Sequence, residues 1–450
     1  MYIAATPSKR SSGVISSSTL ILLAFATAFF SRVIDTIGAP STVNFVHFVT
    51  VPLASVYVLV SAKGKSRQQT ATMWAIVSAL FMLLSVMLTS ALLNKAGVIN
   101  VVLDFMLLGE PFILLLALVS ISLSPASLQK LKKWSIYFCF SHIALAYIQC
   151  YVLKLPQSRP EAGADLIQGV FYFSGAGQVV GATVSLIFGF YYFFSVKNVA
   201  VWLRAAVVFA AVWQMLISDA KQVLLSFLLA WGLLMITKFK DLGKLIQYVA
   251  LAIVVGYGLL WCMQNVPAFR AYNIWIRPEI YGPNGEATLL KSASLRMIPT
   301  YYHTLLNWFF GLGPGHTVGR LGGWMLAEYW SLLSPLGATV HPASKAIWEV
   351  VTASWLGDQS SMFSPLFGWA GIWGDLGFLG LGAYLYLGYL VWSKLCKDDF
   401  SKFLVLNIVV VGLIFSQMEE PGFMLFTALI IGLQWQERRI QEIIAGKRNV

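Results

Sequence analysis

The sequence predicts an all-α polytopic membrane protein with about twelve transmembrane helices, both termini in the cytoplasm and one large helical outer loop. Hydrophobic residues make up 58% of the 450 residues and charged residues only 11%, less than half of the charged share of a typical soluble domain. The apolar residues form long stretches, and the basic residues gather in short clusters between them. This composition excludes a soluble enzyme, a disulfide scaffold and a disordered chain.

The membrane helices follow from length, because a helix needs about 20 mostly apolar residues to cross a bilayer. The apolar stretches lie near 16–31, 43–61, 71–93, 99–122, 134–153, 177–195, 200–217, 222–237, 245–262, 367–392, 403–417 and 423–436. The first stretch follows Lys9 and Arg10 and resembles a signal peptide, but the many stretches behind it favour an uncleaved helix. The chain is expected to divide into helices at 1–262, an outer loop at 263–366, helices at 367–436 and a cytoplasmic tail at 437–450.

The orientation follows from the basic residues, which concentrate in cytoplasmic segments. With the N-terminus inside, the inner segments hold most of the 31 basic residues. These are Lys9, Arg10, Lys63, Lys65, Arg67, Lys130, Lys132, Lys133, Lys197, Arg204, Lys238, Lys240, Lys244, Lys394, Lys397, Lys402, Arg438, Arg439, Lys447 and Arg448. The net charge of +12 therefore reflects topology, and no nucleic-acid partner is expected.

The outer segment from Met263 to Leu366 is far longer than any other connection. A structureless loop of that length is uncommon, so the segment is expected to be partly folded and to carry function. Three stretches rich in Trp and Tyr predict amphipathic helices at the lipid headgroups, at Met297–Phe310, Trp324–Leu333 and Ala343–Leu356.

Cations of this segment predict an anion site. Arg270, Arg277, Lys291 and Arg296 lie close together in sequence, and arginine forks match phosphate oxygens two at a time. Arg296 is the first choice, because Ser294-Leu295-Arg296 opens a predicted interfacial helix; the alternative for each cation is solvated surface. Lys221, which follows Asp219 at a helix start, is either a second phosphate contact or an interfacial anchor paired with a helix cap.

Two residues are candidates for a general base. His316 ends the turn Gly311-Leu312-Gly313-Pro314-Gly315, where it is either a base or an exposed turn residue. Asp358 either accepts a proton from a sugar hydroxyl or caps a helix. No two histidines have metal-ligand spacing and no outer acidic D-x-D occurs, so neither a catalytic metal nor a cofactor is expected.

Acidic residues within the apolar stretches form a further set, because burial of charge in lipid is costly and commonly functional. The set comprises Asp104, Glu110, Asp375, Glu419 and Glu420. Asp104, Asp375 and the last two glutamates are predicted in the outer half of the membrane, close to the long segment. They line a polar cavity or, in a transporter, form a proton path.

Several short motifs, in their order along the chain, resemble those of the bacterial O-antigen ligase and Wzy-type polysaccharide polymerase superfamily. The motifs are the glycine-rich stretch Phe173–Gly181 with Gln178, the stretch Ile217–Lys221 with lysine in place of the family's arginine, Arg296 followed by Trp308–Gly315, and Gly374–Gly380. The topology is similar to that superfamily over most of the chain. Many ligases carry a His-Asn pair where this chain has Ser361–Leu366, so the base role would fall to Asp358, His316 or His341, and a polymerase is favoured over a ligase.

The resemblance implies a metal-independent glycosyltransferase in the bacterial inner membrane, with its active site facing the periplasm. It would polymerise or ligate polyprenyl-diphosphate-linked oligosaccharides, with Arg296, Arg270, Arg277 and Lys221 on the diphosphate and Arg320 on the leaving group or the acceptor. A chain-length regulator and a flippase are the implied partners.

Two other classes remain open. A secondary transporter or flippase would use Asp104 and Glu110, although the two halves of the chain show no repeat. A cell-wall polymerase of the shape-and-division type shares the chemistry but usually has fewer membrane helices.

Overall fold

The computed structural model describes residues 16–62, 66–160, 163–238, 242–269, 278–359 and 361–446. Within these ranges the chain is helical and contains no strand, as the composition predicts. The helices of the first part are α1 Ser17–Phe29, α2 Ser31–Thr36, α3 His47–Ser61, α4 Arg67–Asn94, α5 Val98–Ser120, α6 Pro125–Tyr147, α7 Leu155–Ser158, α8 Gly177–Ser195, α9 Val201–Ile217, α10 Lys221–Ile236 and α11 Leu242–Asn265. Those of the second part are α12 Pro278–Tyr281, α13 Glu286–Met297, α14 Leu306–Phe310, α15 Leu326–Glu328, α16 Trp330–Leu333, α17 Pro342–Ala353, α18 Trp355–Gln359, α19 Gly368–Leu390, α20 Asp399–Ile414 and α21 Pro421–Ile444.

Each apolar stretch predicted from the sequence is helical. Seven of the described helical segments are long and apolar enough to cross a membrane, and α1, α9 and α10 are apolar but shorter. Polar caps fix several starts: Ser66 and Gln69 form a capping box before α4, and Ser124 caps α6 with Pro125 behind it, since these side chains satisfy free backbone N–H groups. Helix α21 continues to Ile444, so the expected tail at 437–450 begins as helix.

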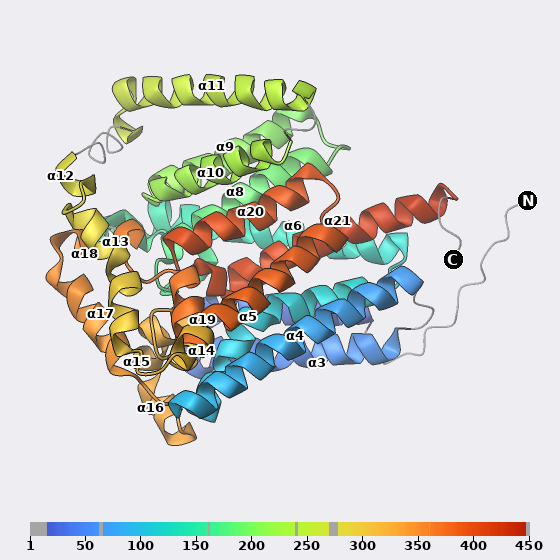
Figure 1. Ribbon diagram of the computed structural model, residues 1–450. Coiled ribbons are helices and arrows are strands. Elements are labelled where there is room, and N and C mark those ends of the chain that lie inside the picture. Colours follow the sequence, from blue (N-terminus) through green and yellow to red (C-terminus); the bar gives the residue numbers. More distant parts are fainter. Residues whose placement is uncertain are drawn as a thin grey trace, which may run out of the picture.

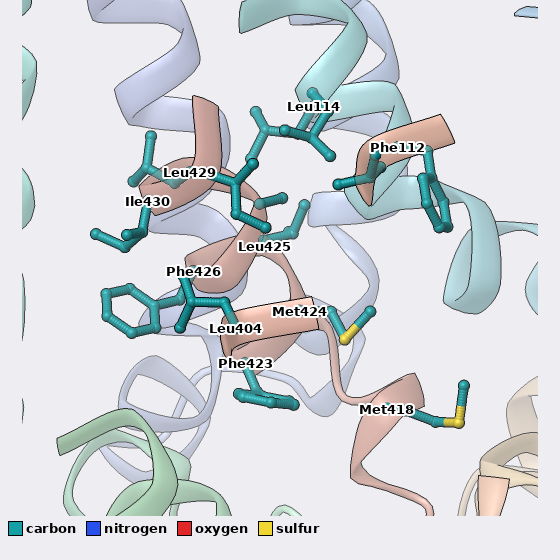
Figure 2. Close-up of a cluster of buried hydrophobic side chains, with 14 of the residues drawn as sticks. Phe112, Leu114, Leu404, Met418, Phe423, Met424, Leu425, Phe426, Leu429 and Ile430 are labelled. Atoms are coloured by element: carbon teal, nitrogen blue, oxygen red, sulfur yellow. The ribbon is translucent and has the colours of Figure 1, made fainter. Parts of the chain in front are cut away.

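Helix α5 is the centre of the bundle and packs against α3, α4 and α21. Figure 1 shows these helices running side by side, with α13–α18 gathered at one end and the C-terminal end of α21 at the other. Figure 2 shows part of the core, where Phe112 and Leu114 of α5 lie near Met424, Leu425 and other side chains of α21. Helix α11 lies apart from this core, and Met263 is its one buried residue.

Two of the three predicted amphipathic helices differ in their details. Met297–Phe310 is not one helix, because a 3-10 turn at Ile298–Tyr301 leads into a break before α14. Trp324–Leu333 is interrupted at Tyr329, between α15 and α16. The third, predicted at Ala343–Leu356, is confirmed as α17, which ends at Ala353.

Helix α19 is broken at Gly377, where φ is 66° and ψ is −164°. The turn Gly311–Gly315, which we call the glycine run, bonds to backbone carbonyls just before this break. Leu312 N–H donates to the Gly374 carbonyl at 2.8 Å, and Gly313 N–H donates to the Asp375 carbonyl at 3.0 Å. A Cβ at Gly311 would lie 2.3 Å from the Asp375 carbonyl carbon, which explains a glycine there. The turn Gly311–Gly315 is therefore held by close backbone contacts between the long segment and the apolar helix α19.

Candidate functional site

A polar pocket lies where the long segment meets α1, α3, α5 and the start of α21. Its lining consists of Ala28, Ser31, Arg32, Asn44, Phe45, His47, Phe48, Leu107, Arg320, Trp324, Met325, Tyr329, Glu420 and Pro421. The volume is about 20 Å³, enough for a water-sized group. A larger ligand therefore requires side chains of the wall to move.

Arg320 is the buried cation of this pocket. Its guanidinium forms an ion pair with Glu420, donates to Ser174 Oγ at 3.2 Å and lies 4.8 Å from the centre of the Trp324 ring. Its backbone N–H donates to the carboxylate of Glu419. Burial lowers the pKa of Arg320, and the negative charge of Glu420 opposes that shift. The charge is thus held by partners on α21 and on the glycine-rich stretch at 173–181.

Arg32 brings a second guanidinium to the same indole. It lies 5.7 Å from the Trp324 ring centre and donates to the Tyr329 hydroxyl at 3.0 Å. Asn44 donates to the same hydroxyl at 3.2 Å and to Asp35 at 2.7 Å. Two arginines around one tryptophan give the pocket two guanidinium groups beside a flat apolar wall.

His47 and Glu110 form a buried dyad at the pocket wall. Imidazole Nδ1 lies 2.9 Å from both carboxylate oxygens of Glu110. When Nδ1 donates to this carboxylate, Nε2 is the acceptor, which is the arrangement of an oriented general base. Glu110, predicted as a functional membrane acid, is thereby the partner of a histidine.

Three further acids lie behind Arg320. Asp375 accepts from Gly315 N–H at 2.9 Å and Thr317 N–H at 2.7 Å, and so anchors the glycine run. Asp375, Asp104 and Glu419 interact electrostatically with one another. The predicted grouping of Asp104, Asp375, Glu419 and Glu420 close to the long segment is confirmed.

His316, predicted as a base or an exposed turn residue, is buried. Its Nδ1 bonds to the Leu312 carbonyl and its Nε2 to Thr339 Oγ1, each at 2.8 Å, and its ring stacks on His341. The exposed alternative is wrong, because the turn folds against α5 through Asn100. Both ring nitrogens are used within the protein, which is typical of a structural histidine.

The other predicted cations lie elsewhere. Arg296 is exposed and donates to Ser292 and the Leu289 carbonyl of its own helix α13. Lys221 pairs with Asp219, close to Asp165 and Gln178. Lys291 Nζ donates to the carbonyls of Ser364 at 2.9 Å and Ile414 at 2.6 Å, and burial lowers its pKa to about 7.

Three predicted residues cannot be placed. Arg270, Arg277 and the side chain of Asp358 lie outside the described residues.

Arg32 and His47 are part of the pocket but were not predicted from the sequence. The available signal for Arg32 is a lone arginine at the end of the first apolar stretch that the predicted topology places outside, where basic residues are expected to be depleted.

The described part of the chain holds no group of three or more His, Cys, Asp and Glu side chains placed to bind a metal ion. The chain matches no protein-family model and no curated protein.

Proposed function

We propose that this protein is a membrane-embedded glycosyltransferase that polymerises or ligates polyprenyl-diphosphate-linked oligosaccharides at the outer leaflet of a bacterial inner membrane. One observation carries the proposal: Arg32 and Arg320 meet at a polar pocket that also contains a carboxylate-oriented histidine. The proposed topology has twelve membrane helices, cytoplasmic termini and the segment 263–366 in the periplasm.

The two arginines suit a diphosphate. Guanidinium groups donate in pairs to phosphate oxygens and stabilise the charge that develops on a leaving diphosphate. Glu420 pairs with Arg320 and would be displaced or share the cation when a phosphate arrives. Trp324, which both arginines contact, offers a flat wall for a sugar or for the lipid next to the diphosphate.

His47 suits the base role. In the proposed step an acceptor hydroxyl attacks the anomeric carbon, and its proton passes to Nε2 of His47. The anomeric carbon–oxygen bond to the lipid diphosphate breaks, and the electron pair leaves with the diphosphate. Glu110 holds the ring in place and stabilises the imidazolium.

The motifs behind the family resemblance also border this region. Ser174 of the glycine-rich stretch donates to Glu420 at 2.9 Å, the glycine run leads into Arg320, and Asp375 of Gly374–Gly380 anchors that run. Their convergence supports a polymerase-like function for a chain without a family match.

The test is polymer formation by purified protein in nanodiscs supplied with a polyprenyl-diphosphate-linked oligosaccharide. Wild type is expected to give a ladder of products on a gel, which Arg32→Ala and His47→Gln abolish. Arg439→Ala is the matched control, because Arg439 lies 5.9 Å from the Trp435 ring at the far end of α21. A ladder that survives in both Arg32→Ala and His47→Gln would contradict the proposal.

A proton-coupled transporter is the second candidate. One observation favours it: Asp104 Oδ2 and Glu419 Oε1 are buried and have no hydrogen-bond partner within the described residues. In that case the same nanodisc protein gives no ladder, and proton-dependent substrate uptake into proteoliposomes is lost in Asp104→Asn.

A further inference from the structure

An apolar cavity of about 230 Å³ lies between α5, α19, α20 and α21. Phe112, Tyr384, Gly388, Trp392, Met424 and Ile431 are among the residues that line it. We call this cavity the aromatic groove. A cavity with such walls stays dry and favours hydrocarbon over polar ligands.

The aromatic groove lies on the same helix faces as the polar pocket that contains Arg32 and Arg320. On α5, Leu107 lines the pocket and Pro111 lines the groove; on α21, Pro421 lines the pocket and Met424 lines the groove. A spacing of three or four residues keeps side chains on one face of a helix and advances them by about one turn of 5.4 Å. The groove therefore begins about one turn deeper in the bundle than the pocket.

One polar group marks the groove. The hydroxyl of Tyr384 is buried and has no hydrogen-bond partner within the described residues. Glu419, which also accepts from the backbone of Arg320, interacts electrostatically with this tyrosine. A buried donor without an acceptor is costly, and an oxygen near the head of a bound lipid would satisfy it.

We infer that the aromatic groove holds the isoprenoid chain of a lipid whose diphosphate enters the pocket of Arg32 and Arg320. The inference rests on the proposed function and adds a separate binding site to it. The two arginines of the pocket suit the anionic head of such a lipid, and the apolar groove suits its hydrocarbon chain. The ring faces of Phe112, Tyr384 and Trp392 suit the flat, methyl-branched units of an isoprenoid.

Two glycines of α19 provide a matched pair of variants. Gly388 lines the groove and Gly382 does not, yet a Cβ at either position would meet no atom within 4 Å. Gly388→Leu therefore fills the groove without a backbone clash, and Gly382→Leu adds the same side chain elsewhere on the helix. Both substitutions favour helix formation to the same degree.

The experiment uses the full chain in phosphatidylcholine nanodiscs and a long-chain prenyl diphosphate with a diazirine on its hydrocarbon chain. After irradiation, mass spectrometry is expected to find the label on Tyr384, Met424 and their neighbours in the groove. Gly388→Leu should reduce this labelling about tenfold, because the leucine side chain takes space that the hydrocarbon chain would otherwise occupy. Gly382→Leu should label like wild type.

Competition identifies the occupant. Excess unlabelled prenyl diphosphate should remove the label, whereas phosphatidic acid with ordinary acyl chains should not. Equal labelling in the two glycine variants, or equal displacement by phosphatidic acid, would overturn the inference and make the groove a site for bulk lipid.

The ladder assay separates this inference from the proposed function. Groove labelling that depends on Gly388, in a wild-type protein that makes no ladder, would leave the lipid site standing and contradict the enzyme. A full ladder from Gly388→Leu, at wild-type rate, would contradict the groove and leave the enzyme standing.

Discussion

Two ion pairs at opposite ends of the bundle differ in their burial. At one end, the side chains of Arg320 and Glu420 are 5% and 6% exposed. At the other end, those of Arg438 and Asp398 are 27% and 37% exposed. Helix α21 connects the two, since Glu420 directly precedes its first residue and Arg438 lies near its end, about 27 Å further along the axis.

The difference separates two uses of charge. A buried ion pair loses more by desolvation than it gains by attraction unless its geometry is excellent, so it is weak evidence for stability. An exposed pair contributes little in either direction. The cost of keeping Arg320, Glu420, His47 and Glu110 inside the protein is therefore better explained by a ligand or a reaction than by folding.

Arg320→Ala should have the largest effect on stability. Removing one partner leaves Glu420 charged and buried, which costs about 3–5 kcal/mol. The double variant Arg320→Met/Glu420→Met should recover most of this loss and still make no polymer. Thermal unfolding in detergent and the ladder assay measure the two effects. A double variant as unstable as Arg320→Ala would show that the lost pair is not the cause.

Asp375→Ala should have an effect of similar size, because Asp375 accepts two backbone hydrogen bonds from the glycine run. Hydrogen bonds to a charged group are worth about 1.5–3 kcal/mol each. Asp398→Ala is the control at the opposite end, where the carboxylate caps α20 through Ser401 N–H and its loss costs about 1 kcal/mol. Hydrogen exchange should rise at Gly315 and Thr317 in Asp375→Ala alone; unchanged exchange there would contradict the anchoring role.

The stability of the end that holds the long segment should depend on pH through His341. Burial lowers the pKa of His341 to about 4, and His316 adds to the shift. The folded state then binds fewer protons than the unfolded state, so stability falls as the pH drops from about 6.5 toward 4. His341→Asn keeps a capping side chain before α17 and should lose less stability than wild type between pH 7 and pH 4.5. Equal losses, measured by thermal unfolding, would exclude His341 as the cause.

Features that depend on neighbouring residues can be predicted from the sequence, whereas contacts between distant residues cannot. Apolar runs and polar caps are local, and they predict that each of the twelve stretches is helical. Two bounds are missed, because α6 begins nine residues before the predicted start and α21 ends eight residues after the predicted end. The acids Asp104, Asp375 and Glu420 also stand out locally, because they interrupt apolar sequence. The pocket depends on pairs far apart in the chain, such as His47 with Glu110 and Arg320 with Glu420. Which cation is buried is decided by helix packing, so Arg320 could not be distinguished from Arg296 by pattern.

Arg438→Ala should cost little, about 0.2–1 kcal/mol, because its pair with Asp398 is exposed to solvent and screened by salt. Its activity in the ladder assay should equal that of wild type. Raising the salt concentration should remove the small difference in stability. A loss as large as that of Arg320→Ala would mean that the two ends do not differ as their burial indicates.

Arg296→Ala should have the smallest effect, although Arg296 is the first choice of the sequence for the diphosphate. Its guanidinium is exposed, bonds within α13 and is absent from the lining of the pocket. Loss of such contacts at a surface changes stability by about 0.5 kcal/mol or less. If Arg32 and Arg320 hold the diphosphate, Arg296→Ala keeps the wild-type ladder while Arg32→Ala loses it. The opposite result would move the diphosphate to α13 and leave the two buried arginines with a structural role.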